Sequence, residues 1–277
     1  MTIEPEQWQL EGAAPWLYER YLVPAVTLPW AIDLVERIRV SYGDRVLDVA
    51  CGTGVVARVA AARVAPGGRV AGLDVNGSML AVAHSLLPAD GAVPIDWYQG
   101  SALALPFLDG QFQIVLCQLG VQFFSDRLAA LREFRRVLVP GGRVGVSVFS
   151  DIEHNPASHA LSDALDRHLG QGASRVKRQE HSLSDVVELQ ALFAASDFAD
   201  VRVETVVRTV HFACTADYVR VQLAATPLAA QLAGLALSER QRLAELLHAD
   251  VDASLASYVR GVGVWLPQEV HVALATV

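Results

Sequence analysis

Residues 46–54 have the sequence VLDVACGTG, a short apolar run that ends in two glycines. A polar stretch at positions 43–45 precedes the run, which is typical of a strand buried on both faces of a parallel sheet. Gly52 and Gly54 can adopt backbone angles closed to other residues, and the apolar stretch 55–64 has helical length and periodicity. We therefore expect a strand, a tight turn and a helix whose N-terminus faces a ligand.

A carboxylate is expected close to this turn. Residues 68–75 (GRVAGLDV) have the pattern of the next strand, and Asp74 lies at its tip. Ligands of open α/β sheets bind at the carboxyl ends of neighbouring strands. Because a carboxylate there can accept hydrogen bonds from both hydroxyls of a ribose, the two segments together predict a nucleotide-like ligand.

Two kinds of ligand fit the glycine turn. The spacing Gly52-x-Gly54-x-x-Ala57 also matches the dinucleotide pattern, which would suit a nicotinamide-dependent oxidoreductase. Asp48, however, lies four residues before Gly52, in the strand end that we expect to face the ligand. A pyrophosphate disfavours a neighbouring negative charge whereas a cation favours it, so we favour a ligand that carries a positive charge.

The segment 47–54 resembles motif I of the class I S-adenosylmethionine-dependent methyltransferases. Four later segments resemble further motifs of that family in the same order: 72–76 (GLDVN), 100–107 (GSALALPF), 112–117 (FQIVLC) and 138–143 (LVPGGR). Several motifs in register are much more specific than one glycine turn. Within the family the chain is similar to the small-molecule branch that includes the ubiquinone and menaquinone methyltransferases.

The resemblance implies an α/β fold with a doubly wound, mostly parallel sheet of seven strands and helical insertions that form a substrate lid. We expect N-terminal helices over the cofactor site in residues 1–43, the cofactor-binding core in 44–150, and the rest of the sheet with the insertions in 151–277, all in one catalytic domain. Within this plan we expect two helices in 5–41, helices at 78–87 and 126–138, a strand at 143–149, and an antiparallel pair formed by 202–210 and 270–277. Substrate selection is expected in the insertions at about 151–181 and 215–257.

The resemblance also implies which residues bind S-adenosylmethionine. They are Asp48, Ala50, Cys51, Gly52, Thr53, Gly54, Asp74, Val75, Met79, Ser101, Ala102, Cys117, Gln118 and Gln122. Ser101 departs from the family, which usually has an acid at this position to accept from the adenine amino group. A hydroxyl accepts that bond more weakly than a carboxylate.

The implied reaction is in-line transfer of the methyl group to an oxygen, nitrogen or carbon nucleophile of a small molecule, giving S-adenosylhomocysteine. Tyr18, Tyr21, Phe123 and His154 are candidates for contacts with the acceptor. His154 follows the fifth expected strand, and an imidazole can accept a proton near neutral pH, so it is also the candidate catalytic base. The alternatives are that His154 only starts the next helix and that the tyrosines are ordinary core residues. A different function on the same fold is binding of S-adenosylmethionine without methyl transfer, as in a pericyclase-like or regulatory protein.

The amino-acid composition limits which binding partners we expect. The 277 residues are 52% hydrophobic with a formal net charge of −8, which argues against a general nucleic-acid surface. We interpret the basic stretch 175–178 (RVKR) as a solvated loop, with a phosphate clamp for an anionic substrate as the alternative. No apolar run has the length of a membrane span, and we expect a cytoplasmic protein. The three cysteines and the histidines lack metal-ligand spacing, so no metal is expected.

Overall fold

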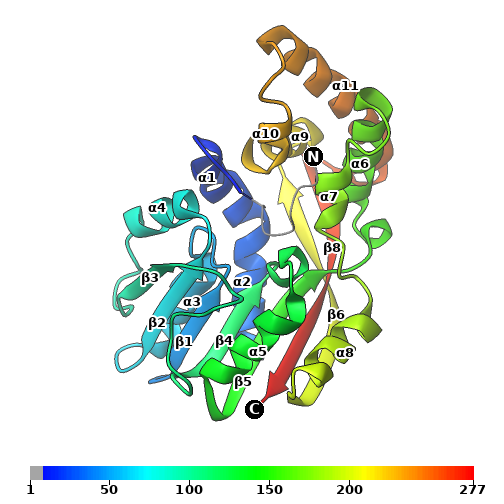
Figure 1. Cartoon of the computed structure of the whole chain (residues 1–277). Coiled ribbons are helices and arrows are strands. Elements are labelled where there is room, and N and C mark those ends of the chain that lie inside the picture. The colour runs from blue at the N-terminus through cyan, green and yellow to red at the C-terminus, as the bar shows by residue number, and fades with distance from the viewer. Residues whose placement is uncertain (1–8) are drawn as a thin grey trace.

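The computed structural model describes residues 9–277. Its strands, from Arg45 to Thr276, form one sheet (Figure 1). The strand order is β3-β2-β1-β4-β5-β8-β6, with the short β7 pairing to β8. The strands are β1 (Arg45–Val49), β2 (Arg69–Asp74), β3 (Ile95–Gln99), β4 (Phe112–Gln118), β5 (Leu138–Phe149), β6 (Ala199–Phe212), β7 (Val259–Arg260) and β8 (Gly263–Thr276). β1 to β5 pair in parallel, and β8 runs antiparallel to both β5 and β6. This confirms the doubly wound sheet and its antiparallel closing pair.

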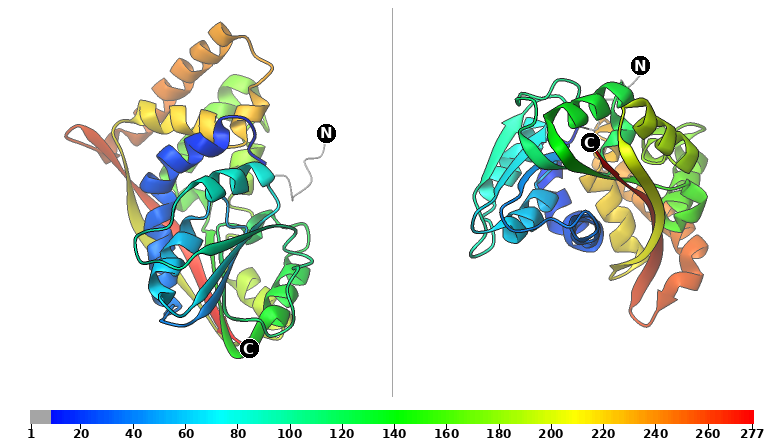
Figure 2. Two further views of the ribbon diagram at one scale, coloured as in Figure 1. Left: turned by 90° about the vertical axis from the view of Figure 1, so that its left-hand side faces the viewer. Right: turned by 90° about the horizontal axis from the view of Figure 1, so that it is seen from below.

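Helices cover both faces of the sheet. On one face α2 (Leu28–Arg37) and α3 (Val55–Val64) share a core with Val46. On the other face α5 (Arg127–Val137) and α8 (Val186–Ala195) pack against residues such as Leu47 and Val49. Alternate residues of β1 thus enter different cores, as the period of a strand requires. Figure 2 shows the two helical layers from the side and from below.

The expected elements occur close to their expected positions. α4 (Gly77–Ser85) and α5 begin after side chains that accept hydrogen bonds from the first turn, those of Asn76 and Asp126. β5 starts at Leu138 rather than Arg143, so the glycines of the turn at 141–142 are part of this strand. The β4–β5 register shifts between the pairs Phe112–Leu138 and Ile114–Arg143, so the extra residues bulge from β5.

The N-terminal region is more continuous than we predicted. The prolines favour two separate helices in residues 5–41, but α1 (Ala14–Leu17), the π-helix η1 (Tyr18–Thr27) and α2 follow one another without a break. Pro24 lies inside η1, where the wider turn accommodates a residue that lacks an N–H donor. The first eight residues of the expected N-terminal region lie outside the described residues.

The insertions form a helical group beyond the carboxyl ends of the central strands (Figure 1). The first insertion contains η3 (Ile152–His154), α6 (Pro156–Leu169) and α7 (Arg175–Gln179). The second contains α9 (Thr215–Ala225), α10 (Leu228–Gln231), α11 (Leu237–Leu255) and η4 (Ala256–Tyr258). β6 and β8 extend past the other strands into this group, and α6 packs against α11.

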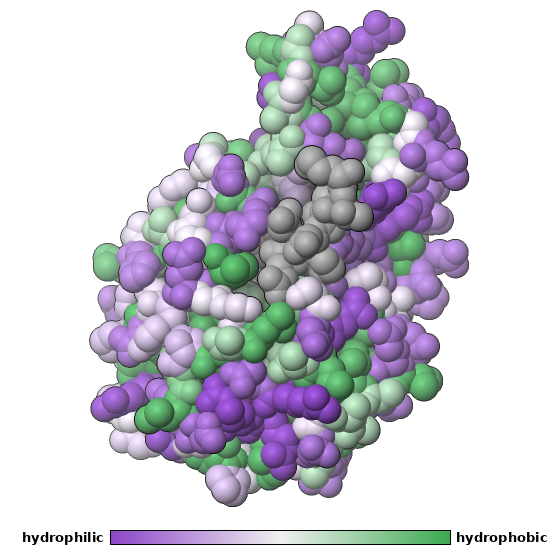
Figure 3. All heavy atoms as spheres, in the orientation of Figure 1, coloured by the Kyte–Doolittle hydropathy of each residue, from purple (hydrophilic) through white to green (hydrophobic). Residues whose placement is uncertain are grey.

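Hydrophilic side chains are spread over the sheet half of the face in Figure 3. Among residues 9–277, no helix combines the length and the apolar character needed to cross a bilayer.

Candidate functional site

A cavity of about 190 Å³ lies between the carboxyl ends of the central strands and the helical insertions. Eleven of the predicted site residues line it. From the strand ends and α4 come Ala50, Gly52, Asp74, Val75 and Met79, and from the following loops come Ser101, Ala102, Gln118, Gln122 and Phe123. Tyr18 of η1 also lines the cavity, so the N-terminal helices contribute to its wall. The cavity thus joins the glycine turn to the insertions.

The turn after β1 is held by the carboxylate of Asp74. Its Oδ2 accepts from the Gly52 N–H at 2.7 Å and its Oδ1 accepts from the Asn76 N–H at 2.8 Å. Burial raises the pKa of Asp74, and the backbone N–H groups that it accepts from oppose this shift. Carboxylate oxygens have further lone pairs, so Asp74 can still accept hydrogen bonds from a ligand in the cavity.

Glycines are required where the turn packs against β3. Gly54 has φ +84°, and a Cβ there would lie 2.2 Å from the indole ring of Trp97. A Cβ on Gly72 of β2 would lie 2.4 Å from the same ring. The backbone at Gly54 therefore packs against Trp97 on the side of the turn away from the cavity. Neither Thr53 nor Gly54 lines the cavity.

Asp48 does not face the cavity, contrary to the prediction. It lies on the same face of β1 as Val46, which α3 covers, and its Oδ2 accepts from the Ala57 N–H at 2.9 Å. Its Oδ1 is buried without a partner among the described residues. Burial raises the pKa of Asp48 to about 8, which the bond from Ala57 only partly opposes. The side chain therefore anchors the start of α3, and a direct contact with a ligand is not part of this arrangement.

The loops beyond β3 and β4 supply polar and apolar parts of the cavity wall. Ser101 Oγ accepts from the Leu103 N–H at 3.1 Å, and the apolar side chains of Met79 and Ala102 lie in the same wall. Gln118 Nε2 donates to the Thr27 carbonyl at 3.0 Å, which ties the loop to η1.

Gln122, in the 3₁₀-helix η2 (Val121–Phe123), has an unusual position. It is 2% exposed, and neither Nε2 nor Oε1 has a partner among residues 9–277. Buried carboxamides are ordinarily hydrogen-bonded, so the unsatisfied Gln122 carboxamide beside the cavity is a candidate partner for a polar ligand. Gln118 Oε1 is unsatisfied in the same way.

The two buried thiols of this region are not suited to nucleophilic chemistry. Burial raises the pKa of both Cys51 and Cys117, which keeps the thiols protonated. Neither lines the cavity. We interpret both as small side chains that fill space behind the turns. The packing there is tight, because a Cβ added to Gly120 would lie 2.8 Å from Cys117 Sγ.

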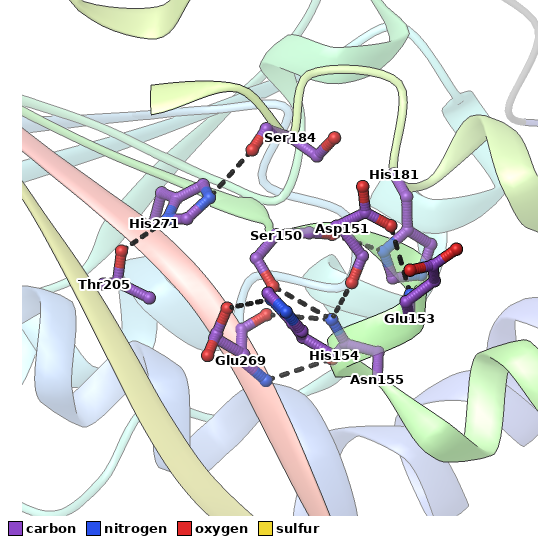
Figure 4. Close-up of polar contacts among 10 residues, drawn as sticks. All are labelled: Ser150, Asp151, Glu153, His154, Asn155, His181, Ser184, Thr205, Glu269 and His271. Atoms are coloured by element: carbon purple, nitrogen blue, oxygen red, sulfur yellow. Dashed lines mark hydrogen bonds and ion pairs between the residues drawn. The ribbon is translucent and has the colours of Figure 1, made fainter. Parts of the chain in front are cut away.

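His154 and Tyr21 lie away from the cavity lining. His154 is exposed, and its Nδ1 is 2.9 Å from Glu269 Oε1 of β8 (Figure 4). The Tyr21 ring faces the guanidinium groups of Arg20 and Arg220. This placement does not support a base at His154 or an acceptor contact at Tyr21.

Asn155, next to His154, lines the cavity and fixes the junction of β5, η3 and β8. Its Nδ2 donates to Ser150 Oγ and to the carbonyls of Asp151 and Glu269, at 3.1 to 3.2 Å. Its Oδ1 accepts from the Glu269 N–H at 3.0 Å. Figure 4 shows this side chain between the three backbone segments. The amide thus sets where the first insertion leaves the sheet.

The basic stretch 175–178 contains a buried residue, contrary to the predicted solvated loop. Lys177 is 4% exposed and lines the cavity with Glu180, 7% exposed, and Gln222. Its Nζ donates to Glu180 Oε2 at 2.7 Å and to Gln222 Oε1 at 3.1 Å. Sequence reasoning missed this cluster because Gln222 lies 45 residues away and α7 is too short to show which face is buried. Its one signal is that Lys177 is the only lysine in the chain.

No group of three or more His, Cys, Asp or Glu side chains within residues 9–277 is arranged to hold a metal ion.

Comparison with known proteins connects this geometry to a family. The model of the ubiE/COQ5 methyltransferase family matches residues 28–171, just over half of the chain. The chain belongs to this family. The matched part contains the glycine turn, Asp74 and the loops at Ser101 and Gln118, and it ends before α7.

Curated relatives match about half of the chain. A 2-phytyl-1,4-naphtoquinone methyltransferase of Thermosynechococcus vestitus is 38% identical over 142 residues, which is 51% of this chain and 60% of that protein. A ubiquinone/menaquinone biosynthesis C-methyltransferase of Stenotrophomonas maltophilia is 41% identical over 124 residues, 44% of this chain and 49% of that protein. The matches thus span about half to three fifths of these relatives.

Solved structures show the same fold. A phosphoethanolamine N-methyltransferase 2 of Haemonchus contortus, solved with S-adenosylhomocysteine, has a TM-score of 0.60 at 19% identity and covers 95% of this chain and 56% of that one. The [4+2]-cyclase SpnF has a TM-score of 0.55 at 20% identity, covering 90% and 80%. At these identities the likeness establishes the fold, and a shared fold does not establish a shared reaction.

Proposed function

We propose that this member of the ubiE/COQ5 family transfers a methyl group from S-adenosylmethionine to a nucleophilic atom of a small molecule. The observation that carries the proposal is the cavity that joins the Gly52–Asp74 turn to the helical insertions. Two relatives that match about half of the chain are named a 2-phytyl-1,4-naphtoquinone methyltransferase and a ubiquinone/menaquinone biosynthesis C-methyltransferase. The insertions lie largely beyond the matched part, so we leave the acceptor to the chemistry of their residues.

The residues of the donor side fit S-adenosylmethionine. Asp74 offers carboxylate lone pairs for the ribose hydroxyls, and Val75, Met79 and Ala102 offer apolar surface for the adenine. The unsatisfied amide groups of Gln118 and Gln122 offer partners for polar groups of the donor.

The bound donor supplies a sulfonium whose methyl group is already activated for displacement. The protein therefore needs to align the nucleophile with that methyl group and to exclude water. The cavity supports the exclusion of water, because its walls come from the sheet, from η1 and from both insertions and are mainly apolar. The three cysteines are free, which fits the reducing cytoplasm in which we propose that the protein acts.

A calorimetric titration with S-adenosylmethionine tests the donor site. We expect Asp74→Asn to weaken binding about thirtyfold, since hydrogen bonds to a charged group are worth about 2 kcal/mol. Asp96→Asn is the matched control, because Asp96 is an exposed aspartate on the adjacent strand β3 and does not line the cavity. Equal affinity of the two variants would show that Asp74 does not bind the donor.

A further inference from the structure

The cavity contains a buried ion pair that the donor site does not use. Lys177 and Glu180 belong to the first insertion, and Gln222 on α9 belongs to the second. All three positions lie outside the part of the chain matched by the family model, residues 28–171. The family match therefore does not assign their chemistry.

A structural role alone is a weak explanation for this pair. Removing two charges from water is costly, and apolar side chains of similar volume would serve stability equally well or better. The neighbouring lining residues Val210, Phe212 and Leu266 are apolar and almost fully buried. A pair of opposite charges in such a wall has its strongest rationale when it interacts with something in the cavity.

The pair retains one donor and one acceptor. An ammonium group has three N–H donors, and Lys177 uses two of them on Glu180 and Gln222. Glu180 Oε2 accepts from Lys177, Glu180 lines the cavity, and no described residue donates a hydrogen bond to Oε1. The pair therefore presents a cation and a proton acceptor side by side.

We propose that Lys177 and Glu180 bind and ionise an acidic hydroxyl of the methyl acceptor, a phenol or an enol. The O–H bond breaks, its proton goes to Glu180 Oε1, and the electron pair stays on the oxygen beside the Lys177 ammonium. The oxygen, or the carbon conjugated to it, then donates an electron pair to the methyl carbon while the pair of the C–S bond stays on sulfur, giving S-adenosylhomocysteine. This inference rests on the proposed methyl transfer.

Charge balance favours this step in a dry cavity. Before proton transfer the lysine, the glutamate and the neutral hydroxyl carry no net charge, and afterwards the lysine, the protonated glutamate and the oxyanion again carry none. No net charge is created away from water, so the step avoids the large penalty of an isolated buried ion. Gln222 holds the lysine in place without adding charge.

The nearby tyrosines act as donors and not as competing bases. Burial raises the pKa of Tyr18 and Tyr218, and the negative charge of Glu180 raises both further. Both tyrosines line the cavity. Their hydroxyl groups stay protonated, so neither tyrosine competes with Glu180 for the proton.

The test uses para-nitrophenol, whose ionised form absorbs visible light, titrated into the full chain without donor. The wild-type protein is expected to ionise the bound probe at a pH where the free probe is mostly neutral, so the phenolate band grows on binding. Glu180→Gln is expected to abolish this band, and Lys177→Met to weaken probe binding about tenfold, as expected for loss of a charge-assisted hydrogen bond. Glu180→Asp keeps the carboxylate and should restore part of the band.

Glu188→Gln is the matched control, because Glu188 on α8 pairs with Arg127 and does not line the cavity. Thermal unfolding and calorimetric binding of S-adenosylmethionine are measured for each variant. A Glu180→Gln protein that folds, binds the donor and still gives the full phenolate band would overturn the inference. Wild-type protein that binds the donor but never ionises the probe would also overturn it while leaving the proposed methyl transfer standing. Failure of the wild type to bind the donor would instead count against the proposed function.

Discussion

Replacing Asp48 by asparagine is expected to change how the stability of the protein depends on pH. Burial raises the pKa of Asp48 to about 8 in the folded protein, whereas an aspartate in an unfolded chain has a pKa of about 3.9. Between these values the folded protein holds a proton that the unfolded chain has released. The free energy of unfolding therefore falls as pH rises from about 4 to about 8, and this contribution levels off above that range.

The magnitude follows from the number of protons. One proton contributes about 1.4 kcal/mol per pH unit, so Asp48 alone should remove about 2.7 kcal/mol of stability between pH 5 and pH 7. The carboxamide introduced by Asp48→Asn does not ionise, and its carbonyl oxygen can keep the bond from the Ala57 N–H. Between pH 5 and pH 7 the free energy of unfolding of Asp48→Asn should therefore rise by about 2.7 kcal/mol relative to that of the wild type.

Urea unfolding at pH 5, 6 and 7 measures the difference. The pKa of Asp74 is also raised, and its charge contributes to the raised pKa of Asp48. Because Asp74 is present in both proteins, the comparison reports Asp48 together with its coupling to Asp74. Asp90→Asn serves as the control, since Asp90 is an exposed aspartate in the loop between α4 and β3. Parallel stability curves for wild type and Asp48→Asn would refute the raised pKa and the enclosure of this carboxyl by α3.

Three further substitutions test the geometry. Gly54→Ala places a Cβ against the Trp97 ring at φ +84° and should cost about 3 kcal/mol by urea unfolding, whereas Gly141→Ala, at φ +75° in open space, should cost about 1 kcal/mol. Asn155→Ala removes four hydrogen bonds at the exit from β5 and should lower the free energy of unfolding by about 3 kcal/mol; an unchanged urea midpoint would contradict the assigned bonds. His154→Ala should leave methyl transfer intact and change stability by less than about 1 kcal/mol, so loss of turnover with normal folding would return this residue to the reaction.

The central sheet and the glycine turn were predictable because local patterns determine them. A buried strand, a turn with two glycines and an apolar helix occur together in residues 46–64, and the observed β1 and α3 lie within this stretch to about one residue. Asp74 was placed correctly for the same reason, since it ends a strand that pairs directly with β1.

The direction of Asp48 was not predictable from this pattern. Alternation along the strand places Asp48 and Val46 on one face, but only the completed fold shows that α3 covers this face. The proximity of Asp48 to the glycines in sequence therefore suggested a ligand contact that the helix prevents.

The cavity wall formed by Lys177, Glu180 and Gln222 could not be derived for a different reason. The Lys177 contact with Gln222 joins two insertions separated by β6, and nothing in either segment alone predicts their packing. The basic neighbours of Lys177 also made a solvated loop the natural interpretation of the stretch. Long-range packing buries this lysine within a basic run, and a single sequence gives no measure of such packing.

The central claim is that the protein moves a methyl group from S-adenosylmethionine to a small molecule. The most direct measurement is incubation of the purified protein with a donor that carries a deuterated methyl group and with a metabolite extract of its source, followed by mass spectrometry. We expect a metabolite that gains the labelled methyl group, an equal amount of S-adenosylhomocysteine, and strong loss of both with Asp74→Ala. A product that forms without label while the donor is not consumed would contradict methyl transfer and indicate a protein that binds the donor for another reaction.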